Sequence, residues 1–331
     1  MIISKTPFRI SLFGGGTDYP EWFEKENGQV ISFAINKYCN VIVRYLPPYF
    51  HYNYRIRFFE EQTAKKIKNI INPVAKESLN YLKFNNHKIE IIHQGDLPGL
   101  SGLGGSSSFA VGILNALNKL KNKDLNNKEL AKEAIKIERN IIGDKVGFQD
   151  QIIASYGGFR SIKFFKNKTF KVESIKTNQK LSKQLENNLI IVYTGIQRFS
   201  KKITTTLSKG ILKDKVNVQL SEIAQSTKEA EKLFKSNSLD LKSLAELINF
   251  QWERKKNLAT GIINNQIEDI YKKGLSSGAL GGKLLGAGGG GFLLFIVPDS
   301  NLKKFKKSFK QFMFFQIKID YDGSKIIYHS K

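Results

Sequence analysis

The chain has 331 residues, of which 41% are hydrophobic and 11% aromatic, enough for about two folded domains and too apolar for a disordered protein. Its 53 lysines and arginines against 29 acidic residues give a net charge of +24. The lysines are scattered and no zinc-finger or RNA-binding signature accompanies them, so we expect no nucleic-acid partner. No apolar run reaches the roughly 18 residues of a membrane span and no signal peptide opens the chain, so we expect a cytoplasmic protein without membrane contact.

The first sixty residues are predicted to be largely β. Ile2 to Phe13 alternates loosely as a strand and runs into a glycine turn that starts at Gly14. The segment from Thr63 to Phe84 has a helical pattern, which Pro73 interrupts. Further strands are expected at Val30–Ala34, Asn40–Leu46, Tyr54–Phe59 and Lys88–His93.

A loop rich in glycine and serine follows the last of these strands. Gln94 to Leu117 begins with turn formers, passes through glycines and serines, and then takes a helical pattern with one apolar face. Glycine lets the backbone approach a ligand, and the first amides of a helix have no intrahelical partners, so this junction is a candidate phosphate site. An ordinary loop with Ser106 as the helix N-cap is the alternative.

The rest of the chain mixes helices and short strands. We expect helices over Lys128–Ile142, which Gly143 ends, and over Phe148–Ser155. The later elements are expected in the order hairpin (Gly158–Phe165, Thr169–Ile175), polar connector (Thr177–Asn188), strand (Leu189–Thr194), helices (Leu220–Lys273), strand (Phe292–Val297), helix (Ser300–Phe314) and two strands (Phe315–Tyr321, Lys325–His329). This pattern predicts an α+β protein with a β-rich N-terminal domain over residues 1–180 and a C-terminal domain over residues 181–331.

Three glycine clusters, at residues 14–16, 99–105 and 286–291, suggest contact with a shared ligand. A Walker A loop is excluded because no Gly-Lys-Ser/Thr triplet occurs. The third cluster spells GxGxxG, but a strand follows it where a dinucleotide-binding fold needs a helix.

Three motifs in chain order carry a family resemblance. They are Pro7-x-Arg9 with the turn through Tyr19, the segment from Pro98 to Ser108, and Lys283 to Gly291. Together they resemble the GHMP kinases, the superfamily of galactokinase, homoserine kinase, mevalonate kinase and phosphomevalonate kinase. The resemblance implies a two-domain α+β fold, with the ATP-binding loop in the β-rich N-terminal domain and a ferredoxin-like C-terminal domain. It also implies ATP and Mg²⁺, with the acceptor bound between the domains.

Residues of the reaction centre are assigned by this resemblance. Asp150 takes the place of the catalytic aspartate, and Glu138 that of the magnesium carboxylate. Arg9 takes the place of a catalytic Lys or Arg, where it would steady Asp150 or offset charge in the transition state. The structural alternatives are a helix N-terminal aspartate, a solvated helix glutamate and a strand arginine that reaches solvent.

The resemblance assigns the ATP phosphates to the second motif. Gly105 stands where many relatives have a serine, so the hydroxyl ligand of Mg²⁺ is left open among Ser106, Ser107 and Ser108, with Ser107 favoured. The nucleotide contacts are expected from Pro98, Gly99, Gly102, Leu103, Gly104, Gly105, Ser106, Ser107 and Ser108.

Asp18 is the candidate for holding the acceptor, because the family's sugar-1-kinases share a Thr-Asp-Tyr here and a carboxylate accepts bonds from two hydroxyls. A turn-capping aspartate is the alternative. Arg198 is expected to grip a distal phosphate, or is a solvated charge. Further acceptor contacts are expected from Gly15, Gly16, Thr17, Gly288 and Gly289.

The glycine turn, the Gln-Asp-Gln around Asp150 and the segment from Tyr193 to Arg198 are most similar to the bacterial heptose-7-phosphate kinases of this superfamily. The resemblance implies phosphorylation of the anomeric hydroxyl of D-glycero-D-manno-heptose 7-phosphate, for the synthesis of nucleotide-activated heptose (GDP-heptose). The partners would then be ATP and a sugar phosphate, and the protein a monomer or homodimer. The alternatives are fucose or an N-acetylhexosamine as acceptor, a diphosphate decarboxylase of the superfamily, and a basic nucleic-acid-binding protein.

Overall fold

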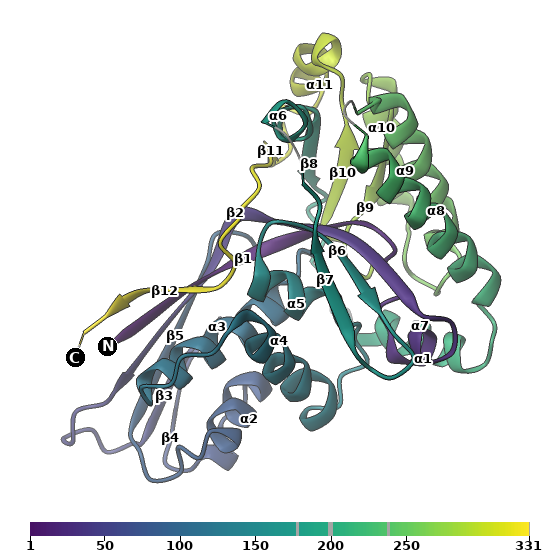
Figure 1. Cartoon of the computed structure of the whole chain (residues 1–331). Coiled ribbons are helices and arrows are strands. Elements are labelled where there is room, and N and C mark those ends of the chain that lie inside the picture. The colour runs from purple at the N-terminus through teal and green to yellow at the C-terminus, as the bar shows by residue number, and fades with distance from the viewer. Residues whose placement is uncertain (177–178, 198–200, 237–238, 331) are drawn as a thin grey trace.

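The computed structural model describes residues 1–176, 179–197, 201–236 and 239–330. These residues form an α+β molecule with two β-sheets, each flanked by helices (Figure 1). In Figure 1 the larger sheet and its helices occupy the lower part of the view, and the smaller sheet stands above them beside a group of long helices.

The larger sheet is built on two long antiparallel strands, β1 (Ile2–Phe13) and β2 (Gly28–Tyr45). It has eight strands in the order β12-β1-β2-β5-β3-β4, and β6 joins β2 with β7 beyond it. The shorter strands are β3 (Tyr54–Arg57), β4 (Glu61–Ala64), β5 (Ile89–Gly95), β6 (Phe159–Phe164), β7 (Phe170–Ser174) and β12 (Lys325–His329).

Helix α3 (Gly105–Leu120) lies against β1 and β2 and contacts the other helices on this side of the sheet. Its Phe109, Val111 and Leu114 are all buried, because this helix has neighbours on several sides. The surrounding helical elements are η1 (Ile67–Asn69), α2 (Pro73–Tyr81), α4 (Asn127–Ile135), the π-helix η2 (Lys136–Ile141) and α5 (Gln149–Tyr156).

The smaller sheet is antiparallel, in the order β11-β8-β10-β9, and its central strand β10 (Phe292–Ile296) is buried throughout. The other strands are β8 (Leu189–Tyr193), β9 (Gly281–Leu284) and β11 (Phe314–Gln316). The remaining helices are α1 (Pro20–Glu26), α6 (Gln179–Asn188), α7 (Lys201–Leu212), α8 (Asn217–Lys235), α9 (Leu241–Lys256), α10 (Asn265–Ser276) and α11 (Leu302–Ser308), with the short η3 (Asp299–Asn301) before α11.

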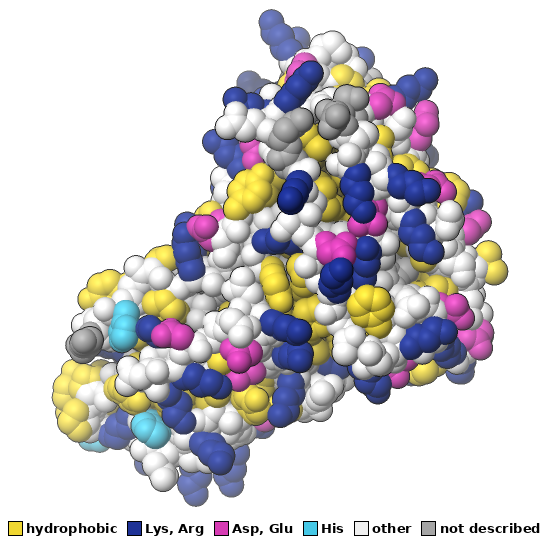
Figure 2. All heavy atoms as spheres, viewed as in Figure 1, with side chains coloured by type: hydrophobic (Ala, Val, Ile, Leu, Met, Phe, Trp, Pro, Cys, Tyr) yellow, Lys and Arg dark blue, Asp and Glu magenta, His cyan; other side chains and the backbone are white. Residues whose placement is uncertain are grey.

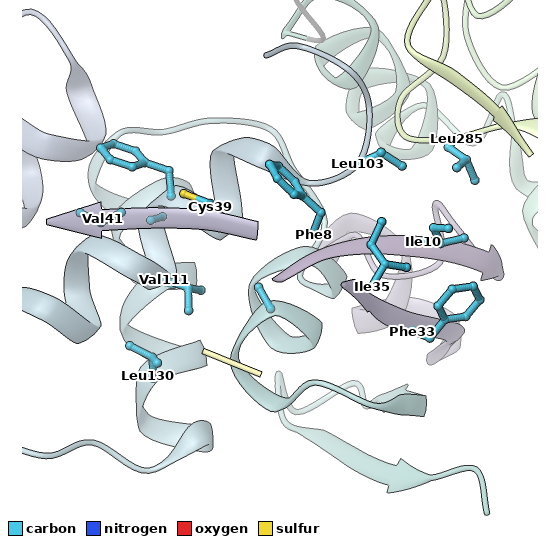
Figure 3. Close-up of a cluster of buried hydrophobic side chains, with 14 of the residues drawn as sticks. Phe8, Ile10, Phe33, Ile35, Cys39, Val41, Leu103, Val111, Leu130 and Leu285 are labelled. Atoms are coloured by element: carbon cyan, nitrogen blue, oxygen red, sulfur yellow. The ribbon is translucent and has the colours of Figure 1, made fainter. Parts of the chain in front are cut away.

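One hydrophobic core reaches from the larger sheet to the glycine-rich loops. Leu103 of the second glycine segment and Leu285 of the third are both fully buried and belong to the same cluster as Phe8 and Ile10 of β1 (Figure 3). The loops are therefore anchored by buried leucines, although their neighbouring residues are glycines.

Most predicted elements are confirmed, including the strand Ile2–Phe13, the hairpin of β6 and β7, and the end of the η2 segment before Gly143. The helix expected over Thr63 to Phe84 is wrong before Pro73, where the chain forms β4 and η1. A residue before proline avoids the helical region, and Asn72 accordingly takes an extended conformation and caps α2.

Three further expectations are wrong. The polar connector is helix α6, whose buried Leu181 and Leu185 lie four residues apart on one face. The helix expected over Ser300–Phe314 stops at Ser308, because Phe314 pairs with β8. The last two strands were expected around one turn, but β11 joins the smaller sheet and β12 pairs with β1.

In the described part of the chain, no helix is both long and apolar enough to cross a bilayer. On the face shown in Figure 2, the lysines and arginines are spread over the surface and interleaved with acidic and apolar side chains.

Candidate active site

The three glycine clusters contribute to the wall of one cavity of about 940 Å³. Gly15 and Gly16 follow β1. Gly99, Gly102, Gly104 and Gly105 lead into α3, and Gly286, Gly288 and Gly290 follow β9. Residues from α5, α7 and α9 complete the wall, so segments from both sheets meet there. The expected convergence of the three motifs on one cavity is therefore observed.

Arg9 and Asp150 form a two-pronged pair in this cavity. Arg9 Nε and Nη2 each donate to a different oxygen of Asp150 at 2.6 Å, and Nη1 donates to the carbonyl of Gly102 at 2.8 Å. The Arg9 side chain is 5% exposed and that of Asp150 is 26% exposed. The planar guanidinium thus holds the Asp150 carboxylate in one orientation and ties it to the glycine-rich loop.

Helix α3 begins at the cavity wall. Its N-cap is Gly104, and no side chain caps the helix. The alternative in which Ser106 is the N-cap is therefore wrong, because the Ser106 hydroxyl donates to Glu138 Oε1 at 2.7 Å instead. The first-turn amides have no capping side chain, and the helix dipole adds partial positive charge there, which together favour an anion.

Glu138 is a buried carboxylate beside this helix start. Ser107 Oγ and Gln151 Nε2 each donate to Glu138 Oε2 at 2.7 Å, complementing the bond from Ser106. Burial raises the pKa of Glu138, against the lowering effect of these hydrogen bonds. Within the described residues it has only neutral donors and no ion pair. Ser108 points elsewhere and donates to the carbonyl of Pro7 at 2.9 Å.

Asp18 is buried on the cavity wall near Asp150. Its Oδ1 accepts from the amide of Gly16 at 3.0 Å, and its Oδ2 accepts from the amide of Gln149 at 3.2 Å. Burial and then the negative charge of Asp150 raise the pKa of Asp18 to about 6. Gly147 packs directly on this carboxylate, since an added Cβ would lie 1.9 Å from Oδ2. The two carboxyl groups thus share one region of the cavity.

The second and third glycine segments pack backbone against backbone. A Cβ on Gly286 would lie 2.5 Å from the carbonyl oxygen of Gly102, so only glycine permits this approach. Lys255 of α9 donates to the carbonyls of Leu284 and Gly286, at 2.7 and 2.6 Å, and holds the third segment from the other side. Part of the glycine signal therefore reflects packing between loops.

Gln251 of α9 anchors the first glycine segment. Its Oε1 accepts from the amide of Gly14 at 3.0 Å, and its Nε2 donates to Ile223, Ser226 and Thr227 of α8. The sequence contains no local signal for this role, because Gln251 and its partners in the glycine turn and in α8 lie far apart along the chain.

An apolar lobe of the cavity was not foreseen. Phe58, His93 and Phe109 pack with ring centroids 4.5–5.3 Å apart, and burial lowers the pKa of His93 to about 4. His93, at the end of the strand expected over Lys88–His93, also lines the cavity. Other apolar residues that line the cavity are Phe59, Pro73, Val74 and Leu97. These residues come from four segments, and no spacing in the sequence connects them.

The structure places the remaining candidates as follows. Arg198 lies outside the described residues. Thr17, Leu103, Ser108 and Gly289 are not among the residues that line the cavity. Thr17 donates to two backbone carbonyls and Leu103 packs in the core. The candidates that do line it are Arg9, Gly15, Gly16, Asp18, Pro98, Gly99, Gly102, Gly104, Gly105, Ser106, Ser107, Glu138, Asp150 and Gly288.

Comparison with known proteins defines the class to which this fold and site belong. Residues 66–158 match the family model described as GHMP kinases N terminal domain, and residues 230–313 match GHMP kinases C terminal. The structure of a D-glycero-D-manno-heptose 1-phosphate kinase from Bacteroides thetaiotaomicron has the same fold, with a TM-score of 0.80 over 100% of both chains at 21% identity. Galactokinase of Lactococcus lactis, solved with galactose, has a TM-score of 0.74 over 98% of this chain and 94% of its own, at 18% identity.

Sequence relatives agree with this class. The D-glycero-alpha-D-manno-heptose 7-phosphate kinase of Campylobacter jejuni is 32% identical over 314 residues, which cover 90% of each chain. The galactokinase of Pyrococcus furiosus is 24% identical over 91% of this chain and 90% of its own. The chain belongs to the GHMP kinases.

Proposed function

We propose that this GHMP kinase uses ATP to phosphorylate the anomeric hydroxyl of D-glycero-D-manno-heptose 7-phosphate, giving ADP and the 1,7-bisphosphate. The observation that carries the proposal is the two-pronged Arg9–Asp150 pair. It contacts the glycine-rich loop through Gly102 and lies close enough to Asp18 to affect its pKa. Phosphoryl transfer to a sugar needs a phosphate site, an oriented carboxylate and a group that holds the sugar, and one cavity contains a candidate for each.

The proposed reaction assigns one role to each of these groups. Asp18 accepts hydrogen bonds from hydroxyls of the sugar and positions its anomeric oxygen. That oxygen forms a bond to the γ-phosphorus as the bond from phosphorus to the β–γ bridging oxygen breaks, and ADP leaves. Asp150 accepts the hydroxyl proton, while Arg9 holds the carboxylate in place and offsets negative charge on the transferred group.

The donor ATP is proposed to occupy the remainder of the cavity. The apolar lobe around Phe58 and Phe109 offers a surface for the purine base, and the uncapped start of α3 offers amides to the phosphates.

Mg²⁺ fits the donor set at Glu138. The buried carboxylate has hydroxyl neighbours at Ser106 and Ser107 and no cationic partner among the described residues, and Mg²⁺ prefers such oxygen ligands. No cluster of three or more His, Cys, Asp or Glu exists in the described ranges, but Mg²⁺ in kinases needs only one or two carboxylates besides phosphate oxygens. When bound, the metal neutralises phosphate charge and orients the transferred group.

The acceptor assignment is supported by the name of the Campylobacter jejuni relative, which specifies heptose 7-phosphate. The product would enter the synthesis of a nucleotide-activated heptose. Fucose is the second candidate acceptor, because a bifunctional fucokinase of Arabidopsis thaliana is 26% identical over 68% of this chain. We also propose residues 1–180 and 181–331 as the two domains, with β12 returning to pair with β1.

The proposal is tested by measuring ATP consumption with a panel of heptose 7-phosphate, heptose 1-phosphate, fucose, galactose and N-acetylhexosamines. Phosphorus NMR of the product identifies the new phosphate ester. We expect turnover with heptose 7-phosphate and an anomeric phosphate in the product. Asp150→Asn is expected to lower kcat by about 10²- to 10⁴-fold, the usual contribution of general acid–base catalysis.

Two results would count against different parts of the proposal. Turnover only with unphosphorylated sugars would refute the heptose phosphate while leaving a sugar kinase. Near wild-type kcat in a folded Asp150→Asn variant would refute the role of Asp150.

A further inference from the structure

Lys283 of β9 is a buried cation in the cavity wall. The residue is 4% exposed, and its Nζ donates to the backbone carbonyl of Leu12 at 2.8 Å. An ammonium group has three N–H donors, and this carbonyl is its one acceptor in the described part of the chain. Nor does Lys283 form an ion pair with any described carboxylate.

Such an arrangement is costly for the protein alone. A buried ammonium without an acidic partner loses its hydration and gains no opposite charge in return. The neighbouring Arg9 pairs with Asp150, and its positive charge still disfavours the charged form of Lys283. Burial, and then the charge of Arg9, lower the pKa of Lys283 to about 7. The counter-charge that would make this cation favourable is not provided by the described protein groups.

Lys283 lines the proposed site close to Arg9. Its acceptor Leu12 lies on β1 between Arg9 and the glycine turn that leads to Asp18. Its own strand continues into the third glycine segment, which packs on Gly102 of the phosphate-binding loop. Lys283 is therefore linked to β1, which carries Arg9 and leads to Asp18, and to the third glycine segment, which contacts Gly102.

We propose that Lys283 binds a phosphate group in the cavity, and that this phosphate supplies the missing counter-charge. The inference rests on the proposed function of the cavity as a kinase site. The phosphate has two sources with the same chemistry, the terminal phosphate of the nucleotide and the phosphate carried by the acceptor. A purely structural lysine, which only ties β9 to β1, is the alternative explanation.

The test compares ligands that differ by one phosphate. Isothermal titration calorimetry would measure the affinities of ADP and the non-hydrolysable AMP-PNP, and of heptose and heptose 7-phosphate, for wild type and Lys283→Met. Lys283→Met removes a charge-assisted hydrogen bond to the phosphate. In one of the two pairs, we therefore expect the variant to bind the ligand with the extra phosphate about 10- to 100-fold more weakly than wild type does. Binding of the ligand without that phosphate should weaken by less than about threefold. A loss confined to AMP-PNP identifies the nucleotide phosphate, and one confined to heptose 7-phosphate identifies the acceptor phosphate.

Stability separates the two explanations. Because a buried charge without an acidic partner is unfavourable, Lys283→Met is expected to keep or raise the Tm of the free protein. If Lys283 has only a structural role, Lys283→Met should lower the Tm and should change the affinities for both ligands of each pair equally. Lys304→Met is the matched control, because this exposed lysine also donates to a backbone carbonyl, that of Ser276, and lies outside the cavity.

The affinities of a folded variant decide whether Lys283 binds phosphate. Equal affinities of wild type and Lys283→Met for all four ligands, or equal losses within each pair, would overturn the inference. If Lys283→Met does not fold, Lys283→Gln retains a donor without the charge and is judged by the same ratios. A wild-type protein that consumes no ATP with any acceptor would refute the proposed function, whereas an active wild type with no phosphate-dependent loss in the variant would refute only the role of Lys283.

Discussion

Replacing Arg9 by lysine tests whether the geometry of the Arg9–Asp150 pair, beyond its charge, is needed. Arg9 donates two hydrogen bonds to Asp150 and one to Gly102, and a lysine ammonium reaches only one of these positions at a time. Each hydrogen bond to a charged group contributes about 1.5–3 kcal/mol, so losing two would cost about 3–6 kcal/mol in a dry site. Asp150 is 26% exposed and water replaces part of the loss, so we expect the free energy of unfolding to fall by about 2 kcal/mol.

The effect on turnover should exceed the effect on folding. A displacement of about 1 Å in a catalytic group can cost about 10²-fold in rate, and we expect kcat of Arg9→Lys to fall by about that factor. Urea unfolding measures the stability, and initial rates of ATP consumption at saturating substrates measure kcat. Arg57→Lys is the matched control, because Arg57 pairs with Glu61 on the surface and exposed pairs contribute about 0–1 kcal/mol.

A folded Arg9→Lys variant with kcat within about threefold of wild type would refute the argument that the fork geometry orients Asp150. A loss of stability without a loss of turnover would assign Arg9 a structural role only.

Three further predictions concern other parts of the cavity. The ionised form of Asp18 accepts sugar hydroxyls, so kcat/KM for the acceptor should fall as the pH falls through about 6, and Asp18→Asn should lack this limb of the pH profile. If Ser107 supplies the hydroxyl ligand of Mg²⁺, Ser107→Ala should weaken the binding of Mn²⁺, measured by EPR, by about tenfold, and Ser106→Ala should weaken it by less than about threefold. The reverse order would assign the metal ligand to Ser106. Gln251→Leu leaves the amide of Gly14 without its partner, so the free energy of unfolding in urea should fall by about 2–4 kcal/mol. The KM for the acceptor should rise. Unchanged stability would contradict the anchoring role of Gln251.

Comparison of sequence and structure shows which features are local. The strand β1, the hairpin of β6 and β7 and the stop at Gly143 were predictable, because alternation, periodicity and turn residues act over a few neighbouring positions. The connector that is helix α6 was not, because this polar segment is stabilised as a helix by tertiary packing of its two buried leucines in the core. The separation of β11 from β12 likewise depends on which edge strand each one reaches.

By itself, the sequence determined the family and the approximate position of the phosphate-binding loop, since the three glycine motifs lie in one order and the loop leads directly into a helix. Only the tertiary structure decided which partners the individual side chains around these motifs have and which of them are buried. It brought Ser106 and Ser107 to Glu138, turned Ser108 away, and buried Lys283 beside Leu12 of β1. These contacts join groups up to 271 residues apart, and no local pattern encodes a hydrogen bond whose two partners meet only when both sheets have folded.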